Sequence, residues 1–271
     1  MLWTKLPRYF VALSSPLLLA LAMLPGFLTT ARAQTKRPTQ TTAAPKQNRV
    51  IFEPRKDQPA PTISLGGGTR SLGNCDSASR VSGQPTQSSA LAQNLNPLLP
   101  SPSTKLQLTA SAHPTFLVYV PRTSAKAMEF VLFADNSEKE IYQTTLNLTG
   151  TPGIVSISVP STTPALEMGK DYRWIVTMAC PSQSEESAPE DPYVQGLVRR
   201  IQSDSSLSQL DKAKPLDRVA LYAKSGFWYE AVANLAALRK AQPSDPEVAS
   251  AWKDLLQSAG LEAIANVPLK N

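Results

Sequence analysis

Seven short apolar runs, separated by turn residues at intervals of about a dozen residues, occupy positions 105–201 of the chain. The runs are rich in β-branched and aromatic residues, which favour strands. A series of short strands of this kind predicts two β-sheets packed face to face around an apolar core. The runs are 106–110, 116–120, 128–133, 140–148, 154–159, 172–180 and 194–201.

The segment before the sixth run indicates which kind of sandwich this is. The pattern Leu166-x-x-Gly169-x-x-Tyr172 resembles the tyrosine corner of immunoglobulin-like and fibronectin-like sandwiches, in which the phenol bonds a backbone group across a turn. We therefore expect residues 62–203 to form a seven-stranded immunoglobulin-like antiparallel β-sandwich. Between two runs, Thr-Pro-Gly at 151–153 predicts a turn in which Gly153 has a positive φ.

A helical period follows, and it predicts a small three-helix bundle at 204–271. Pro215 is expected to begin the first helix and Gly226 to end it; the second spans 228–240. The third is capped by Ser244 or Asp245. Such short helices bury their apolar faces poorly alone, so we expect this tail to pack on the sandwich.

The helical tail also resembles a single tetratricopeptide repeat. One repeat cannot form a solenoid, because stacked neighbours must bury its exposed faces. The matching positions are Tyr222, Gly226, Trp228, Ala231, Leu235 and Pro243.

Residues 1–33 have the features of an export signal. A basic start precedes an apolar stretch at 9–24, and Ala-Arg-Ala at 31–33 predicts cleavage between Ala33 and Gln34. An uncleaved anchor is the alternative, but Ser-Ser-Pro at 14–16 leaves the run short of the roughly 20 apolar residues that a bilayer requires. We expect a periplasmic or extracellular protein without a membrane span after cleavage.

The basic charge of the chain is concentrated near its N-terminus. Residues 34–110 contain nine Lys and Arg against three Asp and Glu, whereas residues 111–271 contain fifteen against eighteen. Residues 34–61 are rich in Pro, Thr and Gln, which predicts a disordered basic linker. A nucleic-acid-binding protein normally carries its basic residues on a folded face, so we expect no nucleic-acid partner.

The two cysteines, Cys75 and Cys180, form an even pair in a chain predicted to be exported. In an oxidising compartment such a pair favours a disulfide, with two free buried thiols as the alternative. The bridge would close a loop of about 105 residues and stabilise the fold by at most about 4.7 kcal/mol. A redox-active pair normally has the Cys-x-x-Cys spacing, which this chain lacks.

The sequence carries no strong catalytic, metal or cofactor motif. The glycine-rich stretch 66–70 lacks the Lys-Ser/Thr of a phosphate-binding loop and is interpreted as an entry loop to the domain. His113 is the only histidine; a hydrolase would need a serine and an acid beside it, and a zinc site would need more ligands. The acidic stretch 185–191 lacks the spacing of a calcium loop. We expect His113 to make a structural hydrogen bond.

Several stretches together resemble the cyanobacterial domain of unknown function 928 (DUF928), over about residues 62–265. They are 66–70 with Cys75 behind it, 112–116, 129–132, 150–155, 169–174, 221–223 and 226–229. The resemblance implies an exported protein with a β-rich domain and a helical tail, at a cyanobacterial cell envelope or exterior. It implies no activity.

Two classes of function follow. The first is a non-catalytic protein that binds or scaffolds an envelope protein or polymer, without a cofactor. The second is an envelope-polymer hydrolase that uses His113 as its base. The absence of clustered catalytic residue types favours the first.

Overall fold

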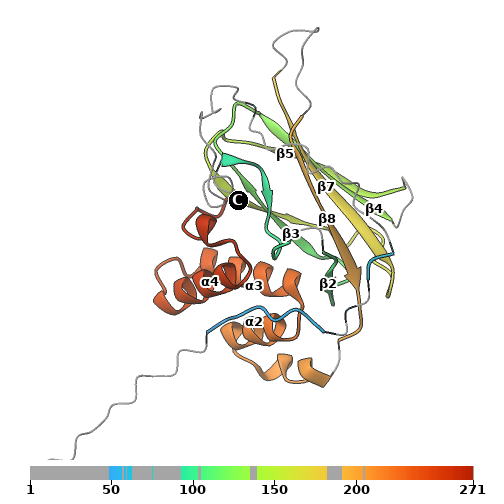
Figure 1. The fold of residues 1–271 in the computed structure, drawn as a ribbon, viewed down its shortest axis with the longest axis vertical. Coiled ribbons are helices and arrows are strands. Elements are labelled where there is room, and N and C mark those ends of the chain that lie inside the picture. The colour runs from blue at the N-terminus through green and yellow to red at the C-terminus, as the bar shows by residue number, and fades with distance from the viewer. Residues whose placement is uncertain are drawn as a thin grey trace, which may run out of the picture. The chain divides into compact units, whose positions relative to one another are not determined.

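The computed structural model describes residues 49–56, 58, 60–62, 75, 93–102, 105–134, 139–181, 191–203 and 205–270. Figure 1 shows strands followed by helices along the chain. The strands are β1 (Asn96–Pro97), β2 (Gln107–Thr109), β3 (Thr115–Val120), β4 (Ala127–Ala134), β5 (Glu140–Asn147), β6 (Gly153–Ser158), β7 (Asp171–Ala179) and β8 (Tyr193–Arg200). The α-helices are α2 (Pro215–Lys224), α3 (Trp228–Ala241) and α4 (Pro246–Ser258), with 3-10 turns η2 (Ser205–Leu207), η3 (Leu210–Lys212) and η4 (Glu262–Ile264).

The described strands form two sheets, one in the order β1-β3-β6 and one in the order β2-β8-β7-β4-β5. Each of the seven predicted runs is a strand, but two details differ from the prediction. An eighth strand, β1, was not predicted because it is only two residues long and contains a proline, which cannot donate a backbone hydrogen bond to a neighbouring strand. In addition, β2 pairs with β8 in parallel, so the sandwich is not wholly antiparallel. Periodicity identifies a strand but not the direction of its partner.

A cluster of aromatic side chains joins the two sheets. Phe116 on β3 lies with its ring centroid 5.2 Å from that of Phe130 on β4 and 5.3 Å from that of Trp174 on β7. All three side chains are fully buried. The sheets therefore share one core, as the alternation of apolar residues predicts.

The turn before β7 contains the bond that the tyrosine-corner pattern predicts. The backbone N–H of Glu167 donates to the Tyr172 hydroxyl over 2.8 Å, and Gly169 has a φ of +77° in the turn. The glycine prediction at 151–153 is wrong, because the positive φ of +74° belongs to Gly150, whereas Gly153 is already part of β6.

The three predicted helices are present with boundaries close to those expected. Pro215 begins α2, and Gly226, with a φ of +78°, follows its end. The Asp245 carboxylate caps α4 by accepting from the backbone N–H groups of Glu247 and Val248. A residue at or next to the helix end sets each of these boundaries, which is why the sequence predicts them.

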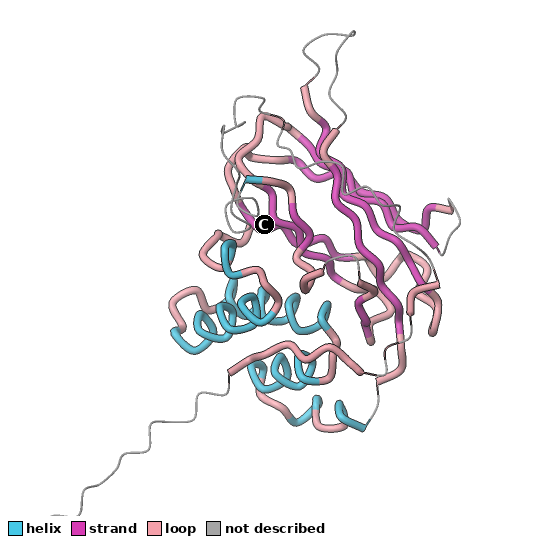
Figure 2. Tube along the Cα trace, in the orientation of Figure 1, coloured by secondary structure: helices cyan, strands magenta, loops and turns pink. Residues whose placement is uncertain are grey.

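The helices pack against the sheets through α3, and Figure 2 shows them gathered at one end of the strands. The indole N–H of Trp228 donates to the Leu98 carbonyl over 2.7 Å, and that of Trp174 donates to the Tyr229 hydroxyl over 2.9 Å. Tyr229 also contacts Phe116 with ring centroids 5.1 Å apart. One hydrophobic cluster consequently runs from both sheets into the helices.

The segment 49–62, called the strap here, overlaps the predicted linker 34–61, and its described residues contact the helices and sheets. Phe52 packs edge-on against Trp228 with centroids 5.1 Å apart, and the N–H of Glu53 donates to the Ala223 carbonyl. Figure 1 shows this blue strap crossing the helices. Val50 and Phe52 are buried while Ile51 is exposed, so the strap alternates like a strand. Its order comes from tertiary contacts that composition does not report.

At the other end of the chain, residues 268–270 lie along β6. Ile154 N–H donates to the Pro268 carbonyl and Lys270 N–H donates to the Ile154 carbonyl, at 2.9 and 2.8 Å. This segment runs parallel to β6 and covers its outer edge. None of the helices in the described part of the chain is long and apolar enough to span a membrane.

Candidate groove between β5 and β6

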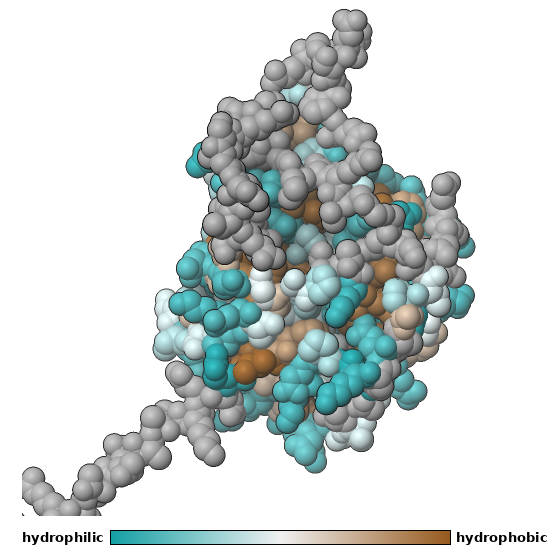
Figure 3. Space-filling view, viewed as in Figure 1, coloured by the Kyte–Doolittle hydropathy of each residue, from teal (hydrophilic) through white to brown (hydrophobic). Residues whose placement is uncertain are grey.

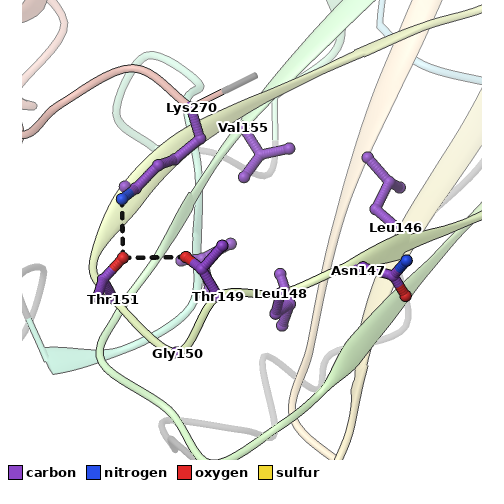
Figure 4. Close-up of a pocket in the computed structure, with 10 residues that line it drawn as sticks. Leu146, Asn147, Leu148, Thr149, Gly150, Thr151, Val155 and Lys270 are labelled. Atoms are coloured by element: carbon purple, nitrogen blue, oxygen red, sulfur yellow. Dashed lines mark hydrogen bonds between the residues drawn. The ribbon is translucent and has the colours of Figure 1, made fainter.

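A groove of about 450 Å³ lies where the chain crosses from β5 in one sheet to β6 in the other. Figure 4 shows its lining side chains. Aliphatic side chains form an apolar floor, and polar groups stand at the rim. The floor consists of Val120, Leu146, Leu148 and Val155, and the polar rim consists of Asn147, Thr149, Thr151 and Lys270.

Backbone hydrogen bonds hold the crossing loop in place. The N–H of Leu148 donates to the Lys126 carbonyl over 2.8 Å, and the N–H of Thr123 donates to the Gly150 carbonyl. Gly150 takes the left-handed conformation that the reversal requires, which side chains with a Cβ rarely adopt. The rim threonines on either side of Gly150 are therefore presented from a fixed turn.

Lys270 is positioned by the pairing of its backbone with β6 and by a second lysine. The Lys240 ammonium donates to the Lys270 carbonyl over 2.5 Å. The stem of Lys270 passes directly over Gly153, where any Cβ would overlap with the Lys270 side chain. A glycine is needed at 153 for this close approach rather than for a positive φ.

A chain of polar contacts connects the rim. The Lys270 ammonium donates to the Thr151 hydroxyl over 2.7 Å, and the Thr151 and Thr149 hydroxyl oxygens lie 2.9 Å apart, as the dashed lines of Figure 4 show. Lys270 is the only charged residue among the described residues that line the groove, and these residues include neither a carboxylate nor an imidazole. This set of groups can bind a ligand, but it holds no acid–base pair.

His113 lies outside this groove. Its ring Nε2 is 2.9 Å from the carbonyl oxygen of Thr163, and its backbone N–H donates to the Ser111 hydroxyl. These contacts join the start of β3 to the loop that precedes β7. They are the structural hydrogen bonds expected of a histidine at a strand entrance.

Cys75 and Cys180 form a disulfide with their Cα atoms 5.3 Å apart. Next to it, the backbone N–H of Cys180 donates to the Asp191 carboxylate over 2.9 Å. The predicted cleavage site at Ala33 and Gln34 and the glycine-rich stretch 66–70 lie outside the described residues. Among the residues that are described, no three His, Cys, Asp or Glu side chains gather as metal ligands.

Two buried carboxylates have roles that the sequence does not signal. Glu230 on α3 uses Oε1 to accept from the Thr109 hydroxyl and from the backbone N–H groups of Ala110 and Ser111. Its Oε2 is buried and accepts no hydrogen bond from the described residues. Burial raises the pKa of this carboxyl and outweighs the hydrogen bonds, which lower it. The arrangement fastens α3 to the end of β2.

The second buried carboxylate, Asp171, fastens the strap to the sheet. It forms an ion pair with Arg199 and accepts from the backbone N–H and the hydroxyl of Thr62. Burial favours the neutral acid, but the hydrogen bonds from Arg199 and Thr62 outweigh it and lower the pKa of Asp171. The partners of both carboxylates are distant in sequence, so no spacing pattern reveals them.

The surface seen from the side of Figure 1 is mixed, with small, separated hydrophobic patches among hydrophilic atoms (Figure 3). Among the described residues, the large apolar side chains that are exposed are Ile51 and Met168. They belong to different segments, the strap and the loop before β7. The groove is therefore the better candidate site.

Comparison with known proteins places the chain in a family. None of the curated proteins matches its sequence. A family model described as a Domain of Unknown Function (DUF928) matches residues 65–269, which include all eight strands and all three α-helices described above. The chain belongs to the DUF928 family.

Proposed function

We propose that the protein is exported to the cell envelope, where it binds or scaffolds a partner without catalysing a reaction. The observation that carries this proposal is the groove between β5 and β6. It combines an apolar floor with a few polar groups that converge at the rim, which is the usual composition of a ligand site. The described residues of its lining include none of the acid–base groups that hydrolysis needs.

Export is supported by the disulfide and by the N-terminal sequence. Disulfides persist in oxidising compartments outside the cytoplasm, and this one joins Cys75 to the end of β7. Together with the predicted cleavage after Ala33, it favours the periplasm or the cell exterior. The resemblance noted in the sequence favours a cyanobacterial source.

Two architectural analogies agree with a binding role. The bond between Glu167 N–H and the Tyr172 hydroxyl is of the tyrosine-corner kind, which favours an immunoglobulin-like arrangement of the sandwich. The α2–α3 hairpin, with Gly226 at its turn, favours one tetratricopeptide-like unit. Such fold analogies only favour a binding role, and the groove is the candidate binding site.

The alternative function is an envelope-polymer hydrolase with His113 as general base. The described hydrogen bonds of its ring end at the Thr163 carbonyl, which does not orient a base toward a nucleophile. We therefore favour binding over hydrolysis.

The experiment measures export and envelope binding together. N-terminal sequencing of the exported protein should begin at Gln34, and this protein should sediment with purified cell envelopes. Thr149→Trp, which fills the groove, should abolish sedimentation, whereas Thr162→Trp on an exposed loop should not. Recovery of the intact Met1 form in the cytoplasm, or release of soluble polymer fragments from the envelopes, contradicts the proposal.

A further inference from the structure

We propose that the groove binds the carboxyl-terminal end of a peptide, with the terminal carboxylate at Lys270 and an aliphatic last side chain on the apolar floor. This inference rests on the proposed binding function and specifies its ligand class. Four features of the described residues support it.

The first feature is charge. Lys270 contributes the only formal charge among the described lining residues. Two further cations, Arg122 and Lys126, are exposed on the loop whose backbone bonds the Gly150 turn and Leu148. An anionic group is thus the complement of the described charges at and around the groove.

The second feature is the direction of the hydrogen bonds. The Thr151 hydroxyl oxygen accepts a hydrogen bond from the Lys270 ammonium, and its own O–H can donate to the Thr149 hydroxyl oxygen, 2.9 Å away. The Thr149 hydroxyl can then donate outward to a ligand, and so can the remaining ammonium protons of Lys270. Two donors at one end of the groove suit the two oxygens of a carboxylate.

The third feature is the floor. Val120, Leu146, Leu148 and Val155 are aliphatic, and none of the described lining residues offers an aromatic ring on which a sugar could stack. An aliphatic side chain gains about 25 cal/mol for each Å² of apolar surface that it buries on such a floor. The floor therefore favours a peptide with a Val, Leu or Ile end over a polysaccharide.

The fourth feature is the far end of the rim. Figure 4 shows the exposed Asn147 amide and Lys270 at opposite ends of the groove, with Leu148 between them. A carboxamide both donates and accepts, which matches the peptide unit that precedes a terminal residue. The acyl chain of a fatty acid has no such group, so Asn147 favours a peptide over a lipid.

The site is also preorganised for binding. Lys270 is held by its pairing with Ile154, by the bond from Lys240 and by the space above Gly153. Its ammonium is therefore fixed beside Thr151, which reduces the entropy lost on binding.

The test uses the full exported chain and a pair of probes that differ in one group. N-acetyl-Gly-Ala-Leu with a free carboxylate should bind at least about tenfold more tightly than the same peptide as its C-terminal amide, measured by isothermal titration calorimetry. Lys270→Ala and Thr151→Val should each reduce the affinity for the free acid to that for the amide. Lys253→Ala, which removes an equal charge from an exposed position on α4, should leave both affinities unchanged.

Gly153→Ala provides a further check, because it displaces Lys270 without removing its charge. It should lose the same preference for the free acid; should this variant not fold, Thr151→Val carries the comparison. Equal binding of acid and amide, or tighter binding of octanoate or of an oligouronate, overturns the ligand class. If neither peptide binds while Thr149→Trp still abolishes sedimentation with envelopes, the ligand class is wrong and the binding function stands.

Discussion

Glu230 is a carboxyl group that the fold buries at the junction of α3 and β2. Three donors approach Oε1, whereas Oε2 is buried without a hydrogen bond from the described residues. Burial raises its pKa above the usual value, so the folded protein retains this proton to a higher pH than the unfolded chain does. Stability must then decrease as the pH rises from the unfolded pKa through the raised folded pKa.

Glu230→Gln keeps the shape of the side chain and its accepting oxygen but cannot ionise. We expect the variant to gain stability relative to the natural protein as the pH rises from 4 to 8, because it avoids placing a charge in the buried site. Thermal unfolding of both proteins across this range measures the difference. Parallel pH profiles would show that the Glu230 pKa is the same in the folded and unfolded chains.

Substitution of His113 distinguishes the binding function from the hydrolase function. Among the described residues, its partners are the Thr163 carbonyl at ring Nε2 and the Ser111 hydroxyl at the backbone N–H. His113→Ala should therefore cost about 1 kcal/mol of unfolding free energy and leave envelope binding unchanged. The hydrolase hypothesis predicts instead that the protein degrades envelope polymer, and that the same substitution abolishes the degradation without unfolding the protein.

Single residues with local partners were predictable from the sequence, and those with distant partners were not. Asp245 accepts from backbone N–H groups two and three residues after it, and Tyr172 bonds a backbone group five residues before it. Glu230, by contrast, bonds groups about 120 residues away, and Lys270 bonds Thr151 across a similar separation. No spacing rule connects such pairs, which is why the groove was not foreseen.

At the scale of elements, the described residues of the strap 49–62 are held by tertiary contacts, although the composition of this segment is mostly polar. Its backbone bonds α2 through Glu53, the N–H of Phe52 donates to the Ser258 hydroxyl, and the Asp171 carboxylate holds Thr62. The apolar triplet at 50–52 was the available signal, but three residues are too few for a period. The longer strands and the helices were predicted because their apolar patterns extend over more residues.

Phe52 and Ile51 are neighbours on this strap with opposite burial, 6% and 42% exposed. Phe52→Ala should cost about 3 kcal/mol of unfolding free energy, since it removes a buried ring from Trp228. Ile51→Ala is the matched control and should change stability by less than about 0.5 kcal/mol. Urea unfolding measures both values. A loss for Phe52→Ala that is as small as the loss for Ile51→Ala would mean that the strap does not stabilise the fold.

At the scale of the whole molecule, the helical tail and the sandwich meet through Tyr229. Its hydroxyl accepts from Trp174 on β7 and donates to the Leu197 carbonyl on β8. Burial raises the pKa of this phenol, which keeps it a neutral donor. The helical tail is thus joined to the sheets by polar bonds as well as by the shared apolar core.

Tyr229→Phe leaves the buried indole N–H of Trp174 without its acceptor. We expect the free energy of unfolding to fall by about 1–3 kcal/mol, with tryptophan fluorescence and far-ultraviolet circular dichroism reporting the same shifted transition.

Deletion of 205–271 should expose the sheet surface that α3 covers and lower solubility. Two separate transitions in the natural protein, or a soluble truncated sandwich that melts as before, would identify independent domains.

Residues 268–270 shield the outer edge of β6 at Ile154. Uncovered edges template the association of one chain with the next, and proteins commonly block them. Proteolytic trimming after Val267 should therefore make the protein prone to aggregation, which light scattering of the trimmed and intact forms would detect. The final residues then determine the colloidal behaviour of the protein during storage and concentration, whatever ligand the groove accepts.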